Sequence, residues 1–266
     1  MSLHSQFLDI IRLQTDTFVH HVELHDSLPS TNDRALVLAS DGTLKTPALV
    51  IARKQTAGRG RGDHKWWSAD GALTFSLILD TRQFGITQRD WPRMSLLTAV
   101  AICDGLTTPC SIKWPNDVLA DGRKIAGILI ESPAAAGGKD RVIVGVGINV
   151  NNSLSSSSSE VRASGISLQE VASVTCDLEQ TLIRFLGAFE QRLAQLVTAD
   201  PALPLTWQKL SSLTDQDVVV EANCHSRIAR CLGIASDGGL LLKTRDGTSQ
   251  IYSGSIRLAE AKPRQA

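Results

Sequence analysis

The sequence lacks the features of several protein classes, and each absence narrows its function. Lysine plus arginine and aspartate plus glutamate number 27 each among 266 residues, so no net charge attracts nucleic acid or an anionic membrane. No apolar run is long enough to span a bilayer, and the N-terminus has no basic segment followed by an apolar core and a small-residue cleavage site. We therefore expect a cytoplasmic protein.

The cysteines and histidines also lack the spacing of a disulfide framework or a metal site. The five cysteines are an odd, scattered set without Cys-x-x-Cys spacing: Cys103, Cys110, Cys176, Cys224 and Cys231. The six histidines have no metal-ligand spacing either. Free thiols are therefore predicted rather than disulfides, and no protein-bound zinc or other resident metal is predicted.

What the sequence does have is a loop of three glycines and two arginines, residues 55–62 (QTAGRGRG). Glycine lets the backbone approach a ligand closely, and arginine hydrogen-bonds carboxylate and phosphate oxygens two at a time. Such runs also occur in disordered RNA-binding segments. The flanking stretches 48–52 and 72–79 are apolar and typical of buried strands, which favours an ordered anion-binding loop.

Three further blocks accompany this loop, and together they carry a resemblance. They are Ser30-Thr31-Asn32, the stretch 113–131 (KWPNDVLADGRKIAGILIE) and residues 145–150 (GVGINV). The four blocks resemble, in order, the catalytic signature of biotin protein ligases. The resemblance spans about residues 22–152, with a weaker likeness over about 213–260, and four ordered blocks make a chance match improbable.

The hydrophobic pattern predicts the elements that carry these blocks. Strands are expected at 21–28, 47–53, 72–80, 111–114, 124–131 and 141–150, and helices from Ser30, over 92–106 and within 167–198. Consecutive strands with few helices between them predict an α+β fold with a mixed, mainly antiparallel sheet and packed helices. The family resemblance implies the same fold, which biotin ligases share with class II aminoacyl-tRNA synthetases.

A change of pattern near residue 214 predicts a second unit. Short strands broken by Asp237-Gly238-Gly239 and Asp246-Gly247 indicate a small barrel, and the resemblance implies an SH3-like C-terminal domain. We therefore expect a catalytic domain at 1–212 and an SH3-like domain at 213–266. Only about twenty residues precede the first strand, too few for a DNA-binding winged helix, so no DNA role is expected.

The resemblance implies a two-step reaction with ATP and Mg²⁺ as cofactors. The biotin carboxylate attacks the α-phosphate to give biotinyl-5′-adenylate, and a lysine of a biotin carboxyl carrier protein then takes the biotinyl group. Two repelling anions must be held in line, so the protein has to supply cations. The resemblance gives that role to Lys124, Arg59 and Arg61. It leaves open a homodimer formed through a sheet edge.

The resemblance also implies two sets of binding residues. The biotin set is Ser30, Thr31, Asn32, Gln55, Gly58, Arg59, Gly60, Arg61, Lys124, Gly127 and Ile128. The nucleotide set is Arg61, Trp66, Asn116, Asp117, Lys124 and Asn149. Ser30 also suits a helix cap, and the Asn-Asp pair also suits an ordinary turn.

One departure keeps two alternatives open. The family often continues the loop with more arginine and glycine, whereas here Gly62-Asp63-His64-Lys65 follows Arg61. Fewer cations and one acid leave the strength of phosphate binding and the retention of the adenylate in question. A catalytically weak biotin-binding module is therefore one alternative. The other is a lipoate or octanoate ligase, which resembles this family in fold and in modifying a carrier lysine.

Overall fold

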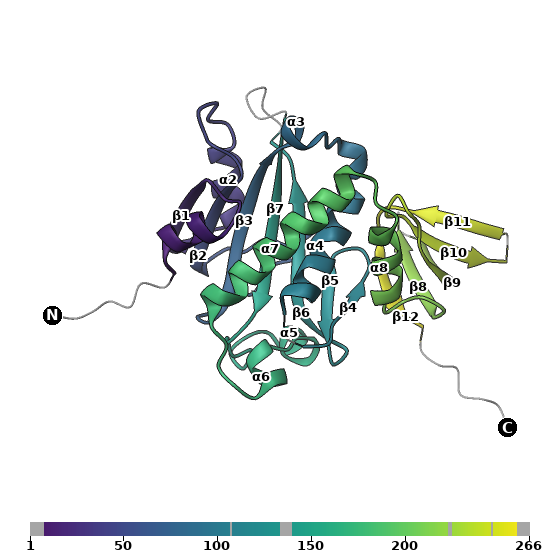
Figure 1. Ribbon diagram of the computed structural model, residues 1–266. Coiled ribbons are helices and arrows are strands. Elements are labelled where there is room, and N and C mark those ends of the chain that lie inside the picture. Colours follow the sequence, from purple (N-terminus) through teal and green to yellow (C-terminus); the bar gives the residue numbers. More distant parts are fainter. Residues whose placement is uncertain (1–7, 107, 134–139, 223–224, 246, 260–266) are drawn as a thin grey trace.

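A seven-stranded sheet forms the centre of the computed structural model, which describes residues 8–106, 108–133, 140–222, 225–245 and 247–259 (Figure 1). Its strand order is β1-β2-β3-β7-β6-β5-β4. The strands are β1 (His21–Leu28), β2 (Ala48–Gln55), β3 (Ala72–Asp80), β4 (Ser111–Lys113), β5 (Asp117–Ala120), β6 (Arg123–Glu131) and β7 (Arg141–Asn149). The β1–β2 pair is parallel and the other neighbours are antiparallel, which confirms the mixed, mainly antiparallel sheet.

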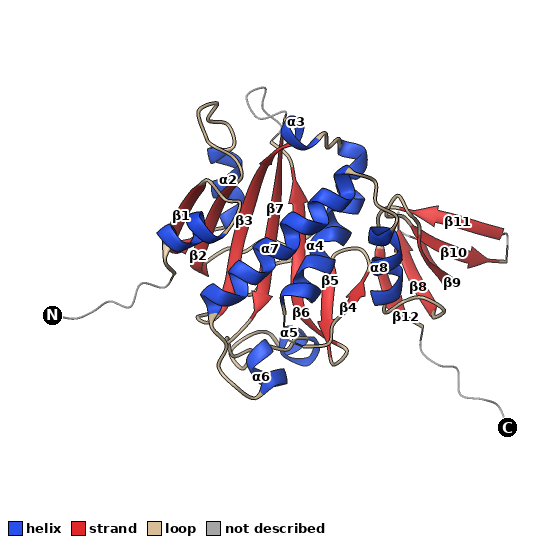
Figure 2. Cartoon of the chain, in the orientation of Figure 1, coloured by secondary structure: helices blue, strands red, loops and turns tan. Residues whose placement is uncertain are grey.

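Helices cover both faces of this sheet because its central strands are apolar on both sides. On one face lie α4 (Trp91–Gly105) and α7 (Leu178–Val197), which cross in front of the strands in Figure 2. Every residue of β3 from Ala72 to Leu79 is buried. On the other face, α2 (Thr31–Leu38) packs Ala35 against Ala48 and Val50 of β2. Since successive β2 residues alternate between the two cores, the strand is buried twice.

The shorter helices occupy the connections between these elements. They are α1 (Ile10–Asp16), α3 (Thr81–Phe84), the 3₁₀ turn η1 (Gln88–Asp90), α5 (Ser159–Ser164), α6 (Leu168–Ala172) and α8 (Ala202–Leu210). The elements that were not expected from the sequence include β5 and α8, besides the short α3, η1 and α5. The β5 strand has only four residues directly after Asn116, and α8 carries Pro204 in its first turn, so each lacks a clear periodic signal.

The C-terminal unit is a five-stranded antiparallel sheet in the order β11-β10-β9-β8-β12. Its strands are β8 (Asp217–Ala222), β9 (His225–Ile234), β10 (Leu240–Thr244), β11 (Gly247–Ile251) and β12 (Ser255–Leu258). The outer strands β11 and β12 are not paired with each other in this order, so a closed barrel is not confirmed. The unit packs on the larger sheet through buried Trp114, whose indole nitrogen donates to the Gly238 carbonyl at 3.0 Å.

The sequence predicted free thiols and no membrane-spanning segment, and both features concern the described part of the chain. Four cysteines there carry free thiols, Cys103, Cys110, Cys176 and Cys231, while Cys224 lies outside the described residues. Among the described helices, none combines the length and the apolar character that crossing a bilayer requires.

Candidate active site

A pocket of about 1170 Å³ opens over strands β6 and β7 and collects nearly all the expected site residues. The expected residues that line it are Ser30, Thr31, Asn32, Gln55, Arg59, Gly60, Arg61, Trp66, Asn116, Asp117, Lys124, Gly127 and Ile128. Gly58 and Asn149 are not among its lining residues. Four separate sequence blocks therefore meet at one cavity, as the resemblance predicts.

The Gly/Arg loop is folded back on itself as a small hairpin between Gly58 and Trp66. The Trp66 amide donates to the Gly58 carbonyl at 2.9 Å, and the Gly60 amide donates to the His64 carbonyl at 2.8 Å. A Cβ on Gly58 would lie only 2.7 Å from the Trp66 carbonyl oxygen, so this glycine permits the close approach. Gly62 turns the chain with φ of 60°, in the left-handed region. The loop is ordered between two buried strands, as expected.

The N-terminus of α2 forms one end of the pocket. Ser30 caps the helix, accepting from the Asp33 amide at 3.3 Å, so the expected capping role is confirmed. The Thr31 amide donates to Gln55 Oε1 at 2.7 Å. Ser76 of β3, fully buried, lies 2.8 Å from the Thr31 hydroxyl. The polar groups at this end are thus held by one another in a mostly buried environment.

The two loop arginines have different partners. Arg59 pairs through Nε with Asp33 at 2.9 Å and through Nη2 with Glu131. Arg61 instead donates from Nη1 to the Gly254 carbonyl at 3.3 Å, in the turn between β11 and β12. Burial lowers the pKa of the Arg61 guanidinium, and the nearby charge of Asp117 opposes that shift. One arginine is therefore fixed to the large sheet and the other to the small one.

Lys124 lines the pocket from β6. Its Nζ pairs with Asp117 Oδ1 at 2.6 Å, and it lies 5.8 Å from the centre of the Trp66 ring. Asn116 donates from Nδ2 to the Ile128 carbonyl at 2.9 Å, which fixes the turn before β5 against β6. The turn residues therefore have structural partners and also face the cavity.

Trp66 lies over two glycines that are paired across β6 and β7, Gly127 and Gly147. A Cβ on Gly127 would lie 3.3 Å from Trp66 Cζ3, and one on Gly147 would collide with the indole ring. The indole nitrogen is buried and has no hydrogen-bond partner among the described residues. The two glycines thus form a flat slot, and the Trp66 ring occupies it.

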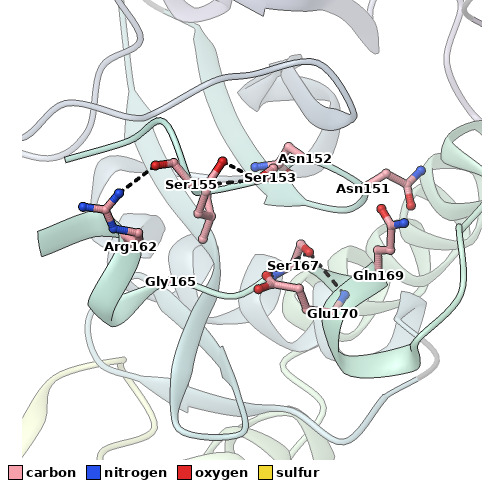
Figure 3. A pocket seen from close by; sticks show the side chains of 10 residues that line it. Asn151, Asn152, Ser153, Ser155, Arg162, Gly165, Ser167, Gln169 and Glu170 are labelled. Carbon is pink, nitrogen blue, oxygen red and sulfur yellow. Dashed lines mark hydrogen bonds between the residues drawn. The ribbon is translucent and has the colours of Figure 1, made fainter. Parts of the chain in front are cut away.

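Asn149, at the end of β7, lies behind the pocket floor. It accepts from Asn152 Nδ2 at 3.0 Å and donates to the Lys124 carbonyl at 3.5 Å. Asn152 lines a second pocket of about 410 Å³, shown in Figure 3 with Arg162, Ser167 and Glu170 around it. Oδ1 of Asn152 is buried without a partner among the described residues. Asn149 therefore joins the floor of the large pocket to the wall of the small one.

Several residues at the site were not assigned by sequence reasoning. Glu131, Gly145 and Gly147 lie inside the recognised blocks but had no role, although alternating glycines in an apolar strand are a signal of close approach. The sequence placed Asp33 in a helix and Ser76 in a strand, and it gave neither residue a role at the site. The stretch 254–256 also lines the pocket, and no local signal indicates that a C-terminal turn returns to a loop almost two hundred residues earlier.

Comparison with known proteins agrees with this geometry. Residues 24–149 match the model of the biotin/lipoate A/B protein ligase family. The bifunctional ligase/repressor BirA of Bacillus subtilis is 34% identical over 92% of this chain and 76% of its own length. The biotin--[acetyl-CoA-carboxylase] ligase of Paracoccus denitrificans is 31% identical over 85% of this chain and 96% of its own length.

A solved structure shares the fold. The biotin protein ligase of Aquifex aeolicus in complex with biotin and ATP superimposes with a TM-score of 0.77 and 24% identity, covering 90% of this chain and 99% of that chain. The family match, the relatives and the shared fold agree with the four blocks that meet at the pocket. The chain belongs to the biotin/lipoate protein ligase family, as a biotin protein ligase.

Proposed function

We propose that this biotin protein ligase activates biotin with ATP in the large pocket and transfers it to a lysine of a biotin carboxyl carrier protein. A biotin carboxylate oxygen attacks the α-phosphorus, the bond to the β-phosphate oxygen breaks, and pyrophosphate leaves. The target lysine then attacks the acyl carbon of biotinyl-5′-adenylate, and AMP leaves. The observation that carries this proposal is the convergence of Lys124, Arg59 and Arg61 on one cavity that the polar residues 30–32 also line.

The three cations have distinct parts in the proposed first step. Lys124 stands between the glycine slot and Asp117, so we assign it to the reacting carboxylate and the α-phosphate. Arg59 and Arg61 flank it from the hairpin and neutralise phosphate charge. Groups fixed before reaction cost no reorganisation as negative charge develops, so prior pairing of these cations favours catalysis.

The buried end of the pocket suits the ureido ring of biotin. Ser30, Thr31 and Asn32 offer hydroxyl and amide groups that are almost fully buried, and a ureido group needs both donors and acceptors. We therefore assign biotin to this end, with its carboxylate directed to Lys124.

The nucleoside of ATP is assigned to the opposite end, toward the second pocket. Asn149 accepts from Asn152 and donates to the Lys124 carbonyl, so it connects the lysine assigned to the α-phosphate with the second pocket. These contacts support a nucleotide role for Asn149, although Asn149 does not itself line the large pocket.

The residues of the site are compatible with Mg²⁺ that binds together with ATP. The described residues hold no group of three or more histidine, cysteine or carboxylate ligands, but Mg²⁺ is commonly held by one or two carboxylates together with substrate phosphates. Of the carboxylates that line the pocket, we assign this role to Asp117, because it lies next to Lys124. When bound, the ion neutralises the charge of the departing pyrophosphate.

Four further assignments stay predictions. They are an SH3-like domain at 213–266 after a catalytic domain at 1–212, a homodimer through a sheet edge, and a cytoplasmic location. The boundary at 212 falls between α8 and β8, where the chain leaves one sheet for the other, which supports two domains. Strand β1 is an edge of the large sheet, which supports pairing with a second copy. Sedimentation and cell fractionation test the last two.

The reaction is tested by weighing the acceptor. The protein is incubated with ATP, Mg²⁺, biotin and a carrier domain, and the carrier is analysed by mass spectrometry. One added biotinyl group per carrier is the expected result. Replacing biotin with lipoate or octanoate tests the alternative ligase, and biotin-dependent release of pyrophosphate separates an enzyme from a biotin-binding module.

A further inference from the structure

Glu131, the last residue of β6, contacts two parts of the site that we have assigned to different ligand groups. Its Oε2 accepts from Asn32 Nδ2 at 2.7 Å, and the same oxygen accepts from Arg59 Nη2. Glu131 itself is not among the residues that line the pocket. One carboxylate oxygen therefore joins the biotin-ring end to a phosphate-binding cation from outside the cavity.

The orientation of Asn32 depends on this contact. A carboxylate only accepts hydrogen bonds, so the side of Asn32 that faces Glu131 must be the amide nitrogen. Its oxygen then faces Ser76, whose hydroxyl donates to Asn32 Oδ1 at 2.5 Å. With both ends fixed and only 4% of Asn32 exposed, the amide has one orientation. Without Glu131 the nitrogen would lose a partner in a buried place.

The position of Arg59 also depends on Glu131. Asp33 holds the guanidinium through Nε, Glu131 holds it through Nη2, and Nη1 has no partner among the described residues. The guanidinium thus keeps two N–H groups for a ligand while its plane is fixed by two carboxylates. Asp33 is a matched comparison for Glu131, because it contacts Arg59 but makes no hydrogen bond to Asn32.

We propose that Glu131 is a positioning residue that couples recognition of the biotin ring by Asn32 to placement of Arg59 for adenylation. The proposal rests on the proposed function. It distinguishes Glu131 from Asp33, which positions Arg59 alone. The network runs without a break from Asn32 through Glu131 to Arg59 and Asp33.

The test compares Glu131→Ala, Glu131→Gln and Asp33→Asn in two measurements: the biotin Kd without nucleotide, and the single-turnover rate of adenylation at saturating biotin. Glu131→Ala is expected to raise the biotin Kd about tenfold, because it leaves the buried Asn32 nitrogen unpaired. It should also slow adenylation about tenfold. Asp33→Asn should slow adenylation and leave the Kd within about twofold of the parent protein.

Glu131→Gln separates charge from hydrogen bonding. Both bonds end on one oxygen, so the glutamine oxygen can accept both while the charge is lost. This variant should keep the parent biotin Kd and slow adenylation as Asp33→Asn does. It also keeps the test valid if Glu131→Ala folds poorly, since restoration of the Kd by glutamine is not expected of a residue that only stabilises the fold.

Two results would overturn the proposal. One is a biotin Kd for Glu131→Ala equal to that of the parent protein, and the other is an equal rise in Kd for Glu131→Ala and Asp33→Asn. Both require a parent protein that binds biotin and forms the adenylate. A parent protein that does neither would instead overturn the proposed function.

Discussion

The pocket has two sides that are built differently. The wall consists of the lining residues of α2, β5 and β6 together with Gly145 and Gly147 of β7. The rim consists of the hairpin 58–66 and the stretch 254–256 that follows β11. Wall residues are buried or half-buried and belong to elements of the large sheet or to α2, whereas Gly62, Asp63 and His64 of the rim are exposed. We therefore expect the wall to change little when the ligand binds and the exposed rim to become more protected.

The largest effect is expected at the wall, from Lys124→Ala. The loss of the cation assigned to the reacting groups should slow biotin-dependent pyrophosphate release by more than about a hundredfold, with the fold retained. Lys65→Ala is the matched control, because it removes an exposed lysine from the rim of the same pocket. Near-normal pyrophosphate release by Lys124→Ala would show that the wall does not carry the reacting cation.

Gly147→Ala tests whether the slot depends on the absence of a side chain. The new Cβ collides with the Trp66 indole, so we expect a loss of stability of about 1 to 3 kcal/mol in urea unfolding. Gly187→Ala in α7 is the control, because nothing lies within 4 Å of its Cβ position. Trp66→Ala should remove most of the penalty. A penalty that persists in that background would place the strain elsewhere on β7.

Lys124 and Trp66 differ in how well their positions could be predicted from the sequence. Lys124 lies in a block with a recognisable order, so its place in the pocket could be predicted. The position of the Trp66 ring over Gly147 could not, because it depends on how the hairpin closes over a strand eighty residues away. The short strand β5 was not predicted, and the open C-terminal sheet was predicted as a closed barrel. Both depend on tertiary packing more than on local periodicity.

At the rim, Arg61→Ala should loosen the hairpin from the small sheet. Its bond to the Gly254 carbonyl is lost, so amide hydrogen exchange over 55–66 should accelerate about tenfold without ligands. Arg59→Ala keeps that bond but loses the pairs with Asp33 and Glu131, so it compares the anchor on the large sheet with the anchor on the small one. Both variants should weaken capture of biotin plus ATP. In the parent protein these ligands should slow exchange over 55–66. Equal exchange with and without them would contradict ordering of the rim.

Behind the wall, the ion pair of Glu23 with Arg34 connects β1 to α2 and gives stability a pH dependence. The Arg34 hydrogen bond lowers the pKa of Glu23 to about 2. A lowered pKa stabilises the fold above the pKa of the unfolded chain, about 4.5, and this contribution disappears as pH falls through about 2. Glu23→Gln should cost about 1 kcal/mol at pH 7 and less at pH 3.

That prediction is checked by urea unfolding at both pH values, with Asp26→Asn on the exposed part of β1 as the control. The cost of Glu23→Gln should shrink at pH 3 while that of Asp26→Asn stays small at both. An equal cost at pH 7 and pH 3 would mean that packing, rather than charge, explains the contribution of Glu23 to the free energy of unfolding.

The smallest effect is expected from Asp63→Arg, at the most exposed part of the rim. Asp63 faces the same cavity as Arg61 and His64, so its charge opposes a bound phosphate. Replacing it with arginine should slow escape of biotinyl-5′-adenylate by less than about 1 kcal/mol, because exposed charges are screened by solvent. The difference should shrink at high salt. An off-rate unchanged at low ionic strength would show that the charge of Asp63 has no consequence for retention of the intermediate.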